Sequence, residues 1–215
     1  MKEVEVKCPL CGHEEIIEIH DMIEVHQDGA LKNSVNSFEI FKYSCNSCQQ
    51  SIPLVYPVTY HDIEKKLMIH FDPEISLDNP ELIDVFEDRI EKTYDQLEGY
   101  TKRFVRDPDS LREKILIRDV QLDDRLIEIL KAYYIYKVTE ENPKIDLKQI
   151  LFNHKEGVNS FVFISENTPM FATEISDIIM DRLETLYRQR ILEVSHEDFM
   201  LVDLEWAYRV IDQKH

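Results

Sequence analysis

The sequence is poor in several features that mark common functional classes. It has four glycines in 215 residues, and none forms the glycine-rich loop that cradles a nucleotide phosphate in many enzymes. No stretch approaches the ~20 consecutive apolar residues that a membrane-spanning helix needs. The first residues, MKEVEVK, alternate charge with valine, so we expect no signal peptide there. These absences predict a cytoplasmic protein whose thiols stay reduced.

Positive charge is also scarce in this acidic protein. Twenty-five Lys and Arg residues stand against 43 Asp and Glu, giving a formal net charge of −18. Nucleic acids and anionic membrane surfaces both attract clustered cations, so we expect the protein to bind neither. The main basic concentration, over residues 102–118, is interleaved with acidic residues. The charge favours a protein partner of basic character, or serves solubility.

The pattern of apolar residues predicts an α+β fold. Up to about residue 75, short segments alternate apolar and polar residues or are rich in β-branched and aromatic ones, which indicates strands. From about residue 76, apolar residues recur at the spacing of helices. Residues 145–165 predict a β-hairpin around Gly157, and the last part of the chain again shows helical spacing.

One long helix is predicted over residues 123–141, where apolar residues wrap well beyond a single stripe. Two explanations remain open. The helix is central to its own domain, or it shares a face with a second subunit of a homodimer. In the second case its three tyrosines, Tyr133, Tyr134 and Tyr136, are the expected contact residues, because aromatic anchors commonly dominate interfaces.

All four cysteines lie in two Cys-x-x-Cys pairs. Cys8 and Cys11 belong to the stretch CPLCG, and Cys45 and Cys48 to CNSC. A pair on a tight turn directs two thiolates at one metal, and two pairs supply the four sulfurs of a tetrahedral zinc site. Four thiolates fill the coordination sphere, so the expected zinc ion is structural and contributes folding free energy.

Other uses of the cysteines fit less well. Disulfides need an oxidising compartment, and a thioredoxin-like motif opens a helix, whereas both pairs lie between strand-like segments. The second turn differs from the first in one respect, since Gln49 follows Cys48 where Gly12 follows Cys11. A left-handed glutamine costs roughly 1 kcal/mol, so we expect the second turn to adopt a different conformation.

Read this way, the cysteine motifs resemble the CpXC family, which is named for paired Cys-Pro-x-Cys motifs. The stretch PVTYHDIEKKLMIHFDPE at 57–74 is similar to the family's Tyr-His-Asp-Pro-x-Lys-Lys segment, with Ile63 in place of the usual proline. Residues 99–131 resemble a later family block. The resemblance spans about residues 4–140 and implies zinc binding without an established activity.

The same evidence predicts the domain organisation. We expect a CpXC-like domain over residues 1–140, made of a zinc-stapled β region at 1–75 and a helical region at 76–140. An α/β extension follows at 141–215. The fold class is thus α+β, with a zinc-ribbon-like antiparallel β region, then helices, then a C-terminal hairpin-plus-helix region.

Two further polar groups are candidate sites. His61 and Asp62 could form an acid–base pair, but an aspartate at the start of HDIEKK more often stabilises a turn. Asp123–Arg125 could bind a substrate, but acidic residues also suit a helix start. We therefore favour a non-enzymatic, zinc-stabilised interaction module that is a homodimer or binds another protein, with no catalytic residue. The alternatives are an enzyme or small-molecule binder with a pocket near these groups, and a nucleic-acid-associated zinc ribbon.

Overall fold

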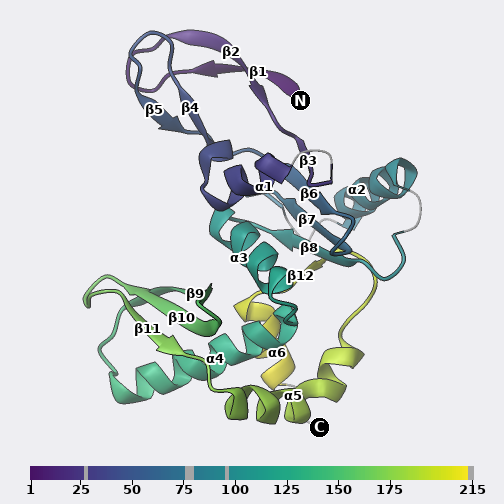
Figure 1. The fold of residues 1–215 in the computed structure, drawn as a ribbon, viewed down its shortest axis with the longest axis vertical. Coiled ribbons are helices and arrows are strands. Elements are labelled where there is room, and N and C mark those ends of the chain that lie inside the picture. The colour runs from purple at the N-terminus through teal and green to yellow at the C-terminus, as the bar shows by residue number, and fades with distance from the viewer. Residues whose placement is uncertain (27–28, 76–79, 95–96, 213–215) are drawn as a thin grey trace. The chain divides into compact units, whose positions relative to one another are not determined.

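The computed structural model describes the chain except for residues 27–28, 76–79, 95–96 and 213–215. The fold is α+β, as predicted: strands come first, helices follow, and a second strand and helix region ends the chain (Figure 1). The chain divides into two compact units. The first comprises Met1–Arg112 with Glu197–Phe199, and the second comprises Glu113–His196 with Met200–His215. An independent domain ending at residue 140 stays a prediction.

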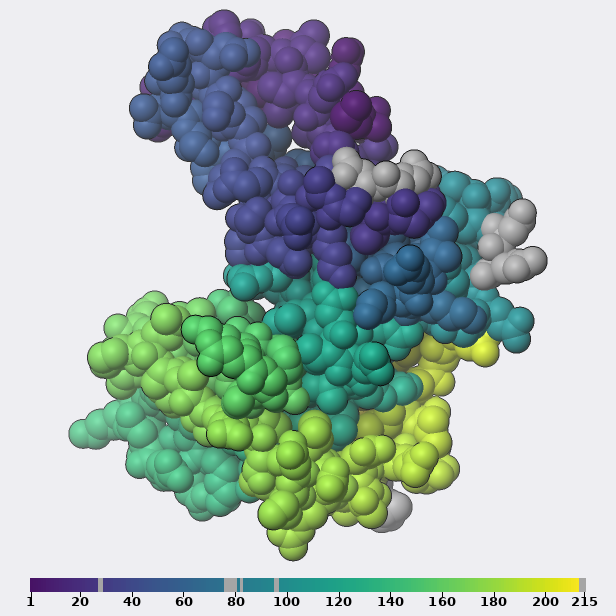
Figure 2. All heavy atoms as spheres, in the orientation of Figure 1, coloured from purple at the N-terminus to yellow at the C-terminus, as the bar shows by residue number. Residues whose placement is uncertain are grey.

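Two antiparallel hairpins begin the first unit. Strand β1 (Lys2–Lys7) pairs with β2 (Glu14–Ile19), and β4 (Lys42–Ser44) pairs with β5 (Ser51–Pro53). The hairpins lie side by side, purple and blue in Figure 2. The chain between them forms strand β3 (Met22–Glu24), helix α1 (Gly29–Asn36) and a 3-10 turn at Glu39–Phe41. Helix α1 lies in the region for which the sequence predicts strands alone.

A mixed sheet forms the core of the first unit. Its strands β8, β7, β6 and β3 lie in that order, with β6 antiparallel to β7 and both outer pairings parallel. Every residue of β6 and β7 is buried. Helix α2 contributes Phe86, whose ring lies 5.5 Å from Phe104 and 5.1 Å from Phe199. The sequence predicts a helix cap at Asn79, directly before Pro80, but Asn79 lies outside the described residues. The bounds are β6 (Val58–Asp62), β7 (Leu67–Phe71), α2 (Pro80–Thr93) and β8 (Thr101–Val105).

The second unit combines helices with a three-stranded antiparallel sheet in the order β11-β10-β9. The β9–β10 turn holds Glu156 and Gly157 at positive φ, the conformation that glycine favours. Strand β11 and the full length of the fifth helix were not expected from the sequence. The elements are α3 (Pro108–Asp119), which begins in the first unit, α4 (Asp124–Glu141), β9 (Leu147–Lys155), β10 (Val158–Ser165), β11 (Phe171–Glu174), α5 (Asp177–Glu193), β12 (Met200–Leu201) and α6 (Leu204–Asp212).

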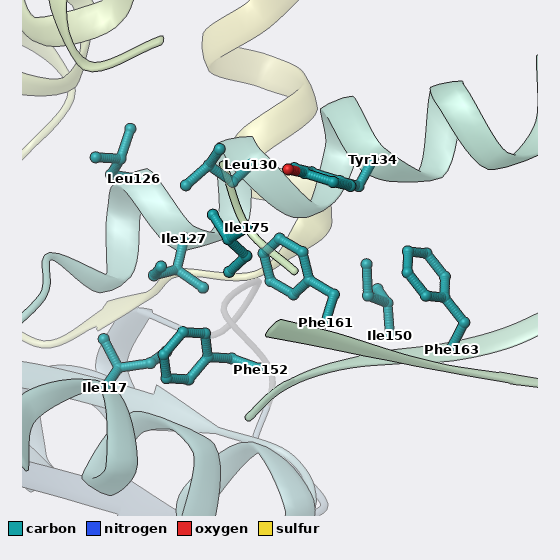
Figure 3. Close-up of a cluster of buried hydrophobic side chains, with 10 residues drawn as sticks. All are labelled: Ile117, Leu126, Ile127, Leu130, Tyr134, Ile150, Phe152, Phe161, Phe163 and Ile175. Carbon is teal, nitrogen blue, oxygen red and sulfur yellow. The ribbon is translucent and has the colours of Figure 1, made fainter. Parts of the chain in front are cut away.

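Helix α4 is central to the second unit. Side chains on one side of the helix pack with those of the sheet, where Tyr134 lies edge-on against Phe161 (Figure 3). The opposite side contributes Ile129 and Ala132 to a second cluster around Trp206. The wide apolar band is therefore covered within this unit, as the central-helix explanation requires. Of the helix's three tyrosines, Tyr136 is the exposed one, at 60%.

Five charged side chains are buried beside these clusters. Lys131 lies 2.5 Å from Glu113 and 3.1 Å from Glu128. Lys114 lies 3.0 Å from Glu128 and 3.1 Å from Asp124. Burial opposes charge on both lysines, but the neighbouring carboxylates raise the pKa of Lys114 and of Lys131 above its usual range. The network ties α3 to α4 by paired charges, and removing one partner would leave another buried and uncompensated.

None of the helices in the described part of the chain has the length and apolar character needed to cross a membrane.

Candidate metal centre

Each Cys-x-x-Cys pair lies on the turn of one hairpin, between β1 and β2 and between β4 and β5. In the first turn the N–H of Gly12 donates to the carbonyl of Cys8 at 2.9 Å, and the N–H of Cys8 donates to His13 at 2.8 Å. The second turn repeats this arrangement, since the N–H of Gln49 donates to the carbonyl of Cys45 at 2.8 Å. The two turns therefore present their cysteines in the same way.

The expectation that the second turn would differ is wrong. Gln49 adopts a left-handed backbone with φ of 57°, close to the 75° of Gly12. The hydrogen bonds of the turn hold this conformation, and a second contact braces it. Asn46 donates its backbone and side-chain N–H groups to the carboxylate of Glu15 on β2, at 3.2 and 2.5 Å. The strain at Gln49 is a local cost that these contacts offset.

The four sulfurs converge on one point. All four Sγ atoms lie within 4.8 Å of one another. The Sγ atoms of Cys8 and Cys48 are 3.7 Å apart, as are those of Cys11 and Cys45. Four sulfurs held at ~2.3 Å from a tetrahedral zinc ion would be separated by about 3.8 Å. A disulfide would need about 2.05 Å, and all four cysteines are free. The cluster could therefore hold a metal ion.

The surroundings of the cluster are a very small core. Cys8 and Cys45 are each 1% exposed and pack with Tyr43 and Ile52, whereas Cys11 at the tip is exposed. The two-stranded hairpins on either side bury few side chains of their own. A region with so little apolar burial depends on another source of stability, which a bound metal would provide.

The cluster does not stabilise four negative charges by itself. Burial opposes charge on Cys8, but the N–H groups of Cys11 and Leu10 and the neighbouring sulfurs lower its pKa to about 6. For Cys45, the N–H of Cys48 favours the thiolate, yet burial and the other sulfurs raise the pKa to about 12. A thiolate is therefore favoured at Cys8 and disfavoured at Cys45, and a divalent cation is the species that would remove this conflict.

His61 and Asp62, at the end of β6, have local structural roles. The carboxylate of Asp62 accepts the N–H of Lys65 at 3.0 Å, which is the turn contact expected from the sequence. The His61 side chain is buried, with Nε2 3.3 Å from the Tyr100 hydroxyl and Nδ1 4.0 Å from Glu24. Burial lowers the pKa of His61 and so favours the neutral ring.

The Asp123–Arg125 group belongs to the second unit and forms a helix start. The Asp123 carboxylate accepts the backbone N–H of Arg125 at 2.9 Å, and the Arg125 guanidinium lies 2.7 Å from the same carboxylate. Asp124 takes part in the buried charge network. All three side chains are thus engaged within the unit.

The basic concentration over 102–118 does not form one exposed patch. Arg103 and Lys114 are buried, at 6% and 3% exposure. The Arg112 guanidinium lies over the ring of Phe38. These three basic side chains are therefore less available to contact the phosphates of a nucleic acid.

Comparison with known families agrees with the cysteine motifs. A model of the CpXC protein family matches residues 6–131, more than half of the chain. The chain belongs to the CpXC family. The CpXC match includes both cysteine pairs and ends within α4, and it confirms the resemblance seen in the motifs. No curated protein and no solved structure matches the chain.

The sequence did not predict two residues that contact the CpXC cysteine turns. Glu15 braces the second turn from β2, and Tyr43 lies against the buried sulfurs from β4. Tyr43 stands two residues before Cys45, and alternate residues of a strand share a face. That spacing could have predicted that Tyr43 lies on the same face as Cys45. The contact of Glu15 could not be predicted in this way, because it depends on how the two hairpins pack together.

Proposed function

We propose that Cys8, Cys11, Cys45 and Cys48 hold one structural zinc ion, and that the chain is a non-enzymatic protein-interaction module. The spacing of the four sulfurs carries the proposal, because it fits a tetrahedral ion and leaves no cysteine over for chemistry. Soft thiolate ligands in a tetrahedral set favour zinc over magnesium or calcium, which take oxygen ligands. Free thiols of this kind fit a reducing compartment such as the cytoplasm.

The surface of the β1–β2 hairpin supports an interaction role. Glu3 pairs with Glu18 across the hairpin, and Glu5 pairs with Ile16. All four are exposed, and Ile16 is 68% exposed. An apolar side chain surrounded by carboxylates suits a basic protein segment with an apolar residue of its own. The module would act as a homodimer or as a subunit of a larger assembly.

Metal analysis of the purified chain tests the zinc proposal. We expect about one zinc per chain, and we expect Cys8→Ser and Cys45→Ser to lose both the metal and the ordered hairpins. Ser47→Ala is a matched control, since Ser47 lies in the second turn, is exposed and carries no thiol. A metal-free wild-type protein with both hairpins intact would contradict the proposal.

Native mass spectrometry of the same samples tests the assembly proposal. A dimer mass for the zinc-loaded chain is the expected result. A monomer at all concentrations would remove the homodimer and leave a different protein as the partner.

A further inference from the structure

The hydroxyl of Tyr43 is a buried polar group that the fold leaves without a role. Tyr43 lies in the centre of β4, opposite Ile52 of β5, and is 9% exposed. Within the part of the chain that the structure describes, its hydroxyl has no hydrogen-bond partner. A buried hydroxyl left unsatisfied costs about 1–3 kcal/mol, and phenylalanine would fill the same space without that cost.

Tyr43 packs among three of the four cysteines and several aliphatic side chains. Tyr43 belongs to the buried cluster with Cys8, Cys45 and Ile52, and Val6, Ile17, Cys48 and Leu54 pack against that cluster. A tyrosine hydroxyl is protonated at neutral pH and can donate one hydrogen bond.

A metal-bound thiolate is a suitable acceptor for that proton. Its sulfur carries negative charge, and hydrogen bonds to charged acceptors are stronger than those between neutral groups. Partners that contact the ligands of a metal orient them and tune the metal's affinity. Cys8 already accepts backbone N–H groups from its own turn, so one further donor would come from the other hairpin and link the two halves of the site.

We infer that the Tyr43 hydroxyl donates a hydrogen bond to the Cys8 sulfur of the loaded site, and that this contact slows loss of the metal. Tyr43 is then a positioning residue, because it acts through a ligand and does not touch the ion. The inference rests on the proposed zinc function.

Tyr43→Phe tests the contact by removing one oxygen atom. The matched control is Tyr56→Phe, since Tyr56 is also buried in the first unit but donates to the carbonyl of Ile40 at 2.8 Å, away from sulfur. We expect Tyr43→Phe to bind zinc about tenfold more weakly in competition with a chelator, because the variant loses one hydrogen bond to a charged group. With ¹¹³Cd in place of zinc, the metal's NMR resonance should move in Tyr43→Phe and stay near the wild-type position in Tyr56→Phe.

The outcomes separate the two proposals. If the wild-type chain binds neither metal, the zinc function is wrong and the Tyr43 contact falls with it. If the wild-type chain binds and Tyr43→Phe matches it in both affinity and ¹¹³Cd shift, only the Tyr43 contact is wrong. Should Tyr43→Phe fail to fold, the ¹¹³Cd-loaded wild-type protein decides. A slowly exchanging Tyr43 hydroxyl proton coupled to ¹¹³Cd supports the contact, and a hydroxyl that exchanges as fast as in free tyrosine overturns it.

Discussion

Replacing Gln49 by glycine should stabilise the first unit, although glycine usually weakens a fold. Gln49 sits at φ of 57°, where a residue with a Cβ atom is strained by about 1–2 kcal/mol. Glycine adopts this conformation freely but loses about 0.5–1 kcal/mol more conformational entropy on folding. The difference predicts a net stabilisation of about 0.5–1 kcal/mol for Gln49→Gly.

The first turn provides the reciprocal experiment. A Cβ atom built at Gly12 meets no atom within 4 Å, so Gly12→Gln would be strained by the backbone alone. We expect it to destabilise by a similar amount, and we expect the double variant to return close to wild type because the gain at position 49 and the loss at position 12 are of similar size.

The assay is urea unfolding of the zinc-loaded protein, followed through the amide NMR signals of residues 8–13 and 45–50. These signals report on the two turns directly, whereas the single tryptophan, Trp206, lies in the second unit. A Gln49→Gly variant that unfolds at the same or lower urea concentration would refute the reasoning. It would mean that the left-handed backbone at Gln49 is not strained.

Two more predictions concern buried ionisable groups. Lys131→Met should destabilise the second unit by about 3–5 kcal/mol, because Glu113 and Glu128 lose their shared cation; calorimetry checks this, with the exposed Lys137→Met as a control that should unfold like wild type. Burial lowers the pKa of His70 to about 4 from the usual 6.5, so the unfolded chain takes up a proton that the folded chain refuses. Stability should therefore fall as the pH drops from 6.5 toward 4, by on the order of 3 kcal/mol. The His70→Asn variant can keep the hydrogen bond to Thr59 but has no imidazole to protonate, so its stability should change less between pH 6.5 and 4 than that of wild type. An equal loss of stability in the variant would show that His70 is not the group responsible.

The sequence was most informative where chemistry fixes the spacing. Two Cys-x-x-Cys pairs separated by strand-like segments were enough to predict a four-sulfur cluster on two turns. The long helix at 124–141 was also evident, because its breadth of apolar residues indicates burial on several sides. Asp123 was expected at its start, and the structure places the side chain there as the cap.

Other features depended on tertiary contacts that local patterns do not encode. Helix α1 has a weak apolar pattern, and Val35 is its one buried residue among those described. The turn at Gln49 overrides local preference because hydrogen bonds and the Glu15–Asn46 contact hold it. The charge network was hidden because Lys114 and Glu128 look like surface residues in sequence, and only the packing of α3 on α4 buries them together.

X-ray absorption at the zinc edge tests the central claim most directly, since it counts and identifies the atoms around the ion. For the purified chain we predict four sulfur neighbours at about 2.3 Å and no oxygen or nitrogen neighbour. A shell containing a light atom, such as a water oxygen beside three sulfurs, would contradict a closed structural site.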